Sequence, residues 1–128
     1  MSSNPSSLKY ADTHEWVRLE DSGEITVGIT DHAQDLLGDL VFAELPEVGQ
    51  RFTAKEECML LESVKAASDI YMPVSGEISA VNTRLEDEPE IINEDSFGEG
   101  WLFKIQADNS ADIEGLLSAE GYESSLDE

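Results

Sequence analysis

Short apolar segments that end at glycine or proline recur through this sequence, and they restrict the folds that it can adopt. Ile25, Val27 and Ile29 alternate with smaller or polar residues, so their side chains share one face of a strand. We expect strands over residues 15–20, 24–29, 40–44, 58–62, 70–72, 76–82 and 101–105. Several short strands with turn residues between them predict a mainly β fold, either a barrel or a sandwich.

The helices expected beside these strands are short. Thr30 can cap a helix over residues 31–37, which Gly38 would end. A single helical turn is expected within residues 86–93, inside a polar loop that also contains isoleucines. These helices would lie at the edges of the β structure.

The chain is expected to form one domain over residues 1–128, because no linker rich in proline, glycine and serine divides it. Residues 1–7 are small and polar, and we expect them to be frayed. A hairpin is expected over about 58–72, and a C-terminal helical segment over about 110–126, where apolar residues have helical spacing.

The charge balance excludes several kinds of partner. The chain has 29 acidic and 7 basic residues, a formal net charge of −22, whereas nucleic acid and anionic membranes select basic surfaces. No apolar run reaches the length of about 18 residues that a membrane-spanning helix needs, and no secretory signal is recognisable. We therefore expect a cytoplasmic protein. With Cys58 as the only cysteine, no internal disulfide or multi-cysteine metal site can form, and no metal is expected.

Lysine is scarce, and one lysine stands between two strand-like segments. Lys65 is followed directly by Ala66 and Ala67, so it can occupy the tip of a tight hairpin with little bulk around it. A catalytic lysine needs burial or a neighbouring cation, whereas Glu62 and Asp69 are acidic. Two interpretations stay open: an ordinary surface lysine at a turn, or an attachment point for a prosthetic group.

The segment around Lys65 resembles the lipoyl-attachment signature of the glycine cleavage system H protein family. The matching residues are Glu62-Ser63-Val64-Lys65-Ala66-Ala67-Ser68-Asp69-Ile70-Tyr71 and Pro73-Val74-Ser75-Gly76-Glu77-Ile78. Further segments match in the same order, at residues 8–10, 14–17, 28–34, 38–49, 89–93 and 98–102. The likeness therefore extends over almost the whole chain.

This resemblance implies a barrel-sandwich hybrid of the biotinyl/lipoyl type, with lipoate in amide linkage to Lys65. It implies an attachment motif made of Glu62, Ser63, Val64 and Ala66 around that lysine. By position it also implies a cleft for the loaded arm, for which the candidates are Thr13, Glu15 and Asp69.

The same resemblance implies a carrier and not an enzyme. A glycine decarboxylase with pyridoxal phosphate would release carbon dioxide and load an aminomethyl group on the lipoyl sulfur. A tetrahydrofolate-dependent aminomethyltransferase would take the one-carbon unit and release ammonia, and a flavin dihydrolipoamide dehydrogenase would reoxidise the dithiol with NAD. A lipoyl or octanoyl transferase or a lipoate ligase would attach the group, and a monomer is expected.

Two other functions stay open at this stage. The chain could donate lipoate to other lipoyl domains, which is a relay role within the carrier class. Alternatively, it could be an unmodified interaction domain that carries no arm.

Overall fold

The computed structural model describes residues 8–11 and 13–126, so the segment 1–7, expected to be frayed, lies outside the described residues. The strands are β1 (Lys9–Tyr10), β2 (Glu15–Leu19), β3 (Ile25–Ile29), β4 (Leu40–Glu44), β5 (Arg51–Phe52), β6 (Glu57–Ser63), β7 (Ala67–Tyr71), β8 (Gly76–Val81) and β9 (Phe103–Ala107). The helices are α1 (Asp31–Leu37), α2 (Arg84–Asp87), α3 (Ile91–Glu94), the 3-10 helix η1 (Ser110–Gly115) and α4 (Ala119–Leu126). Among these helices, none is both long and apolar enough to cross a membrane.

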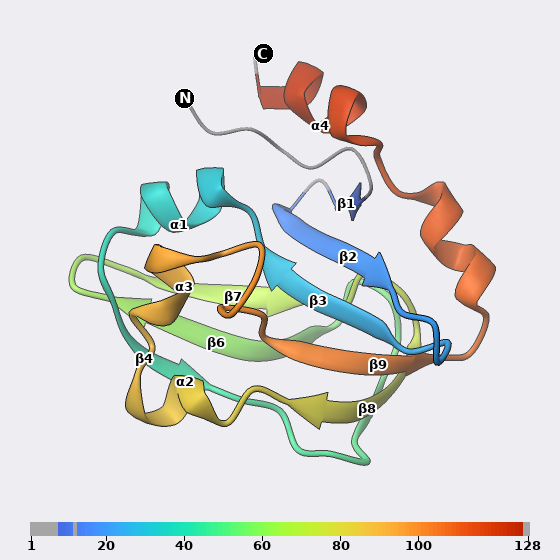
Figure 1. Cartoon of the computed structure of the whole chain (residues 1–128), viewed down its shortest axis with the longest axis horizontal. Helices are drawn as coiled ribbons and strands as arrows, with labels where there is room; N and C mark the ends of the chain where they lie inside the picture. The colour runs from blue at the N-terminus through green and yellow to red at the C-terminus, as the bar shows by residue number, and fades with distance from the viewer. Residues whose placement is uncertain (1–7, 12, 127–128) are drawn as a thin grey trace.

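Two antiparallel sheets form the body of the molecule (Figure 1). One has six strands in the order β1-β2-β3-β9-β8-β5, and the other has three in the order β4-β6-β7. Buried side chains from both sheets meet in one core, for example Val27 of β3, Ile105 of β9 and Leu61 of β6. The mainly β, barrel-sandwich fold expected from the sequence is confirmed.

A second, smaller core joins the first strands to the C-terminal helix. Leu8, Tyr10, Trp16, Ala119 and Tyr122 are buried together there, and the rings of Tyr10 and Tyr122 stack with centroids 5.0 Å apart. This cluster holds α4 against β1 at the upper edge of the molecule in Figure 1.

The expected helix over residues 31–37 forms with the expected bounds. The Thr30 hydroxyl accepts a hydrogen bond from the Ala33 amide, which satisfies one of the free donors of the first turn. Gly38 ends the helix with φ 82, a left-handed conformation that glycine adopts at little cost. The polar loop expected to hold one helical turn forms two, α2 and α3.

Several strand boundaries differ from those expected, and β7 for example runs from Ala67 to Tyr71 instead of over residues 70–72. The strand expected over residues 101–105 is β9, which starts only at Phe103, because the Trp101 amide donates to the Gly98 carbonyl and so belongs to a turn. The C-terminal helical segment expected over about 110–126 forms two helices, η1 and α4, because Leu117 between them exchanges two backbone hydrogen bonds with Tyr10, of 2.7 and 2.8 Å. A residue paired with a strand in this way cannot be helical, so α4 begins only at Ala119.

Candidate functional site

Lys65 lies at the tip of the β6–β7 hairpin. The Ser63 amide donates to the Ala66 carbonyl over 2.7 Å, which closes the turn. The Ser63 hydroxyl oxygen also accepts from the amides of Lys65 and Ala66, at 3.3 and 3.0 Å. A serine that bonds the backbone of the following residues favours a turn over a continued strand. The sequence therefore ends β6 at Ser63 and projects Lys65 from the sheet.

The side chain of Lys65 is exposed and lies over a glycine. A Cβ atom added to Gly38 would stand 3.3 Å from Lys65 Cε and 3.9 Å from Lys65 Nζ. A side chain at Gly38 would therefore be in tight contact with the end of the lysine side chain. Within the described part of the chain, no acidic residue forms an ion pair with Lys65.

The hairpin tip is also bonded to the segment that joins α1 to β4. The Val64 amide donates to the Asp39 carbonyl over 3.0 Å. Asn93 of α3 donates to the Gly38 carbonyl and accepts from the Leu40 amide, both over 2.9 Å. The residues before and after Asp39 are therefore both held by one side chain.

Thr13 and Glu15, two candidates for the arm cleft, are in direct contact. Glu15 is buried, with 1% of its surface exposed, and one of its carboxylate oxygens accepts a hydrogen bond from the Thr13 hydroxyl. Its other oxygen accepts from the amide of Tyr71, at the end of β7, over 3.4 Å. A buried carboxylate is thereby fixed between the start of β2 and the end of the hairpin.

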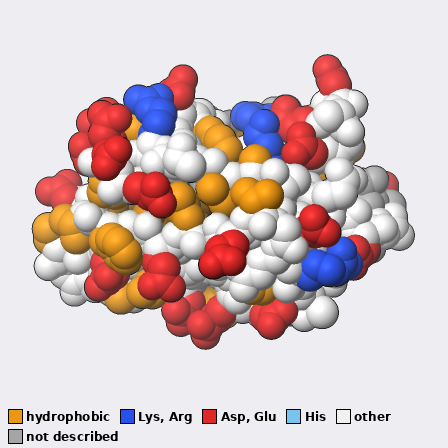
Figure 2. Space-filling view, turned by 90° about the horizontal axis from the view of Figure 1, so that it is seen from below, with side chains coloured by type: hydrophobic (Ala, Val, Ile, Leu, Met, Phe, Trp, Pro, Cys, Tyr) orange, Lys and Arg blue, Asp and Glu red, His pale blue; other side chains and the backbone are white. Residues whose placement is uncertain are grey.

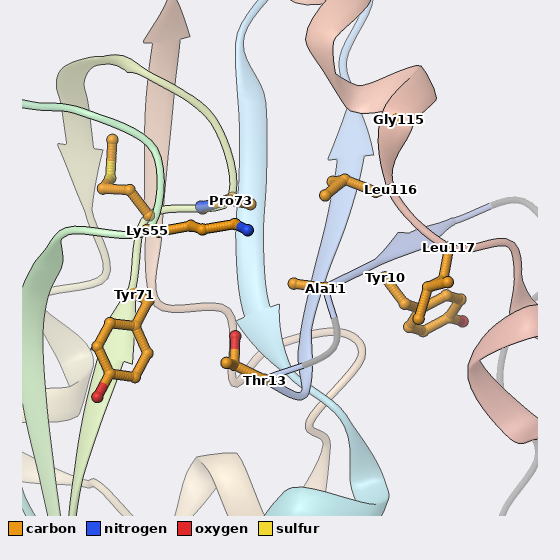
Figure 3. A pocket seen from close by; sticks show the side chains of 10 residues that line it. Tyr10, Ala11, Thr13, Lys55, Tyr71, Pro73, Gly115, Leu116 and Leu117 are labelled. Carbon is orange, nitrogen blue, oxygen red and sulfur yellow. The ribbon is translucent and has the colours of Figure 1, made fainter. Parts of the chain in front are cut away.

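A cavity of about 530 Å³ lies next to the two residues that bond this carboxylate (Figure 3). Thr13 and Tyr71, which both bond Glu15, line one side of it. Lys55 extends its side chain into the space in Figure 3, and Leu116 faces it from the C-terminal segment. The cavity thus lies between β1, the hairpin and the segment before α4.

Asp69, the third candidate for the arm cleft, lies on β7 opposite Leu60. It is exposed and lines a second hollow of about 450 Å³, together with Glu44, Glu47 and Glu57. The structure thus joins Thr13 to Glu15 by a hydrogen bond, whereas Asp69 faces a separate acidic hollow.

Cys58 is a buried residue of β6, within the hairpin itself. Its thiol donates to the Ile70 carbonyl, and burial, followed by the negative charge of Glu15, raises the pKa of the thiol to about 12. It therefore stays protonated and unreactive at neutral pH. Across residues 8–11 and 13–126, no group of three or more His, Cys, Asp or Glu side chains is arranged to hold a metal ion.

The sequence did not single out Gly38 or Asn93 as part of this site. Gly38 was expected only as the end of a helix, and its contact with Lys65 depends on how the hairpin folds back. Asn93 is far from Lys65 in the sequence, and only the packing of α3 against α1 brings it to Gly38. The one local signal is a polar residue directly after the buried pair Ile91 and Ile92.

Comparison with known proteins identifies a family that the whole chain resembles. The family model described as Glycine cleavage H-protein matches residues 8–128. The glycine cleavage system H protein of Pseudoalteromonas translucida is 61% identical over 128 residues, which cover 100% of this chain and 99% of that protein. The corresponding protein of Psychrobacter cryohalolentis is 61% identical over 126 residues, 98% of this chain and 100% of its own.

A solved structure gives the same result for the fold. The crystal structure of a glycine cleavage system H protein from Mycobacterium marinum superimposes with a TM-score of 0.88 at 39% identity, covering 98% of this chain and 100% of that one. Sequence and fold therefore agree over the whole length, and the chain belongs to the glycine cleavage H-protein family.

Proposed function

We propose that this chain carries lipoate in amide linkage on Lys65 and acts as the mobile carrier of the glycine cleavage system, without catalysing a reaction itself. The observation that carries the proposal is the exposed amine of Lys65 at a hairpin tip, in a chain that belongs to this family. An amine that serves as an attachment point has to be reached by another enzyme, so exposure and small neighbours are what this role requires.

The residues around Lys65 fit such a group. Ala66 and Ala67 add little bulk, and Gly38 has no side chain to press on the end of the lysine. When bound, lipoate supplies a disulfide that can be reduced to a dithiol and can carry a one-carbon unit on sulfur. The chain's own contribution is to hold the attachment point clear of the sheets.

The residues of the attachment motif have two different roles in this proposal, one in shaping the turn and one in recognition. Ser63 shapes the turn by accepting the amides of Lys65 and Ala66. Val64, 69% exposed, and the exposed Glu62 flank the lysine, where an attaching ligase or transferase would read them. An exposed apolar side chain beside an acid is a suitable recognition feature because it offers both contact area and charge.

Thr13 and Glu15 are proposed to receive a positively charged group carried near the hairpin, and Asp69 is proposed to attract that group from the separate acidic hollow. The buried Glu15 carboxylate is oriented by the Thr13 hydroxyl and the Tyr71 amide, so its charge is fixed in place. Ammonium groups form their stronger hydrogen bonds with carboxylates, and a preoriented carboxylate loses less entropy on binding one. Asp69 would add negative charge along β7.

The acidic surface fits a carrier that visits several partners in turn. Figure 2 shows Asp and Glu side chains spread over one face of the molecule, with apolar patches between them. With a net charge of −22, the chain would be steered to basic entrances on its partners, at rates that fall with added salt. The partners proposed are the decarboxylase, the aminomethyltransferase and the dihydrolipoamide dehydrogenase named above, in the cytoplasm, with this chain as a monomer.

Intact mass tests the proposal. The purified chain is incubated with lipoate, ATP and a lipoate ligase, and we expect the mass gain of one lipoyl group, located on Lys65 by peptide mapping. Lys65→Arg keeps the charge and removes the acceptor amine, so it should gain nothing, whereas Lys55→Arg should be modified like the unaltered chain. Absence of an adduct on the unaltered chain, or a full adduct on Lys65→Arg, would refute the proposed attachment.

A further inference from the structure

We infer that Asn93 is a positioning residue for Lys65: it fixes the segment on which the hairpin tip rests, so that the lysine is presented in one orientation to the enzyme that modifies it. This inference rests on the proposed attachment at Lys65. Asn93 touches neither Lys65 nor the hairpin in any hydrogen bond, and it acts through Gly38 and Asp39.

The side-chain amide of Asn93 forms three hydrogen bonds with α1 and with the segment that follows it. Its nitrogen donates to the Gly38 carbonyl and to Gln34 Oε1, both over 2.9 Å. Its oxygen accepts from the Leu40 amide over 2.9 Å. One side chain thus connects the last turn of α1, the glycine that ends the helix, and the first residue of β4.

Asn93 is itself held firmly. The two residues before it, Ile91 and Ile92, are 6% and 0% exposed and belong to the main core, which fixes the short helix α3. A side chain that starts from a fixed helix and makes three hydrogen bonds has little freedom left. The position of Gly38 and Leu40 is therefore set by the core and not by the loop itself.

Two contacts transmit this position to Lys65. Gly38 lies under the lysine, so close that an added Cβ would stand 3.3 Å from Lys65 Cε. Asp39, between the two residues that Asn93 bonds, accepts the amide of Val64 over 3.0 Å. If Asn93 releases Gly38 and Leu40, both the surface under the lysine and the anchor of the tip become free to move.

An asparagine is required for this pattern because it combines two N–H donors with one acceptor on a short side chain. Asn93→Ala removes all three bonds. Asn93→Asp keeps the size and the acceptor for Leu40, but it places a carboxylate oxygen against the Gly38 carbonyl, where no donor remains. Both variants should therefore loosen the same segment, and the second tests the role even if the first folds poorly.

Asn82 offers a matched control. It is a buried asparagine whose side-chain nitrogen donates to the carbonyls of Glu99 and Trp101, both over 2.8 Å. It follows β8 in the six-stranded sheet, whereas the hairpin belongs to the three-stranded sheet. Asn82→Ala thus removes a comparable set of bonds without touching the segment under Lys65.

The test compares three readouts at matched folded fraction: the initial rate of enzymatic lipoylation, the rate at which acetic anhydride acetylates Lys65, and hydrogen exchange at the Val64 amide. For Asn93→Ala and Asn93→Asp we expect enzymatic lipoylation to slow at least about 10-fold, because a misplaced reactive group loses its productive geometry. Chemical acetylation should be unchanged since Lys65 stays exposed, and Val64 exchange should rise about 10-fold as local opening becomes easier.

A loss of stability alone cannot produce this combination. Asn82→Ala should leave enzymatic lipoylation, acetylation and Val64 exchange as they are. If both Asn93 variants are lipoylated at the unaltered rate, or if Asn82→Ala slows as much, the positioning role is refuted while the attachment site stands. If the unaltered chain takes no adduct at Lys65, the proposed function is refuted and the role of Asn93 with it.

Discussion

The amide nitrogen of Val64 lies 3.0 Å from the carbonyl oxygen of Asp39, so the residue beside Lys65 is bonded to a segment outside its own hairpin. Hairpin tips are usually held only by their own turn. Here Ser63 closes the turn from within, and Asp39 anchors it from outside. An exposed lysine on a segment that is held from two sides fits the attachment role proposed for Lys65.

Gly38 should matter for the orientation of Lys65 more than for stability. Alanine at this position would keep φ 82 and ψ −160, a region that is essentially restricted to glycine and costs about 1–3 kcal/mol, but the end of a lysine side chain can move aside cheaply. Gly23→Ala is the control, because Gly23 has φ 93 and no atom within 4 Å of an added Cβ. We expect similar losses in urea unfolding for both variants, and shifted Lys65 side-chain NMR signals only for Gly38→Ala. Unshifted Lys65 signals in that variant would show that the contact does not orient the lysine.

Tyr122 should anchor the C-terminal helix through its hydroxyl. That oxygen lies 2.7 Å from both His14 Nδ1 and Thr30 Oγ1, in the smaller core. Tyr122→Phe keeps the stack on Tyr10 but removes one hydrogen-bond partner from the buried Thr30 hydroxyl and from the half-buried His14 ring, at a cost of about 0.5–1.5 kcal/mol in the free energy of unfolding. Tyr71→Phe is the control, because the Tyr71 hydroxyl forms no hydrogen bond with a described residue. Equal unfolding free energies for the two variants would contradict the anchoring role.

Glu20 should contribute to stability at neutral pH and lose that contribution in acid. The hydrogen bond from the Thr26 hydroxyl, followed by that from Arg18, holds the pKa of the Glu20 carboxyl below its ordinary value. A lowered folded-state pKa stabilises the protein above the unfolded value of about 4.3, and this stability is lost as the pH falls through the folded value.

Thr26→Val removes the first of these donors while keeping the shape of the side chain. We expect the pKa of Glu20, followed by carboxyl NMR, to rise, and the loss of stability in acid to become shallower. Thr26→Ser should restore the lowered pKa because it restores the hydroxyl. A pKa of Glu20 that is the same in all three proteins would assign the shift to Arg18 instead.

Cys58 should resist alkylation in the folded protein. Burial raises the pKa of its thiol to about 12, so almost no thiolate exists at pH 8 and the sulfur is shielded. Iodoacetamide should therefore modify the native chain far more slowly than the chain in urea, as read from intact mass. Because the folded-state pKa is raised, the neutral thiol also adds stability below about pH 8.5, and this is lost at higher pH. Equal alkylation rates with and without urea would show that the hairpin opens readily.

The parts of the fold that depend on local sequence were predictable. The helix 31–37 has its cap at Thr30 and its end at Gly38, and both signals lie next to it in the chain. The hairpin tip at Lys65 was predicted in the same way, from the strand-like segments on either side of it.

The parts that depend on long-range pairing were not predictable. Leu117 has helical spacing with Ile113, but it pairs with Tyr10, which is more than a hundred residues away. The contact of Asn93 with Gly38 requires α3 to pack against α1, and no local pattern signals that approach. Likewise, the hydrogen bond from Thr13 to Glu15 is local, but only the fold brings Tyr71 to the same carboxylate.

The chain passes from the six-stranded sheet to the three-stranded sheet through α1, between β3 and β4, and Lys65 stands on this crossover. The segment that supports Lys65 therefore lies where the chain crosses from one sheet to the other. A larger side chain at the buried Ala43 of β4 is expected to strain the packing between the layers, and we expect such strain to shift the segment under Lys65 as well. The orientation of the Lys65 side chain thus depends on both sheets and not on its hairpin alone.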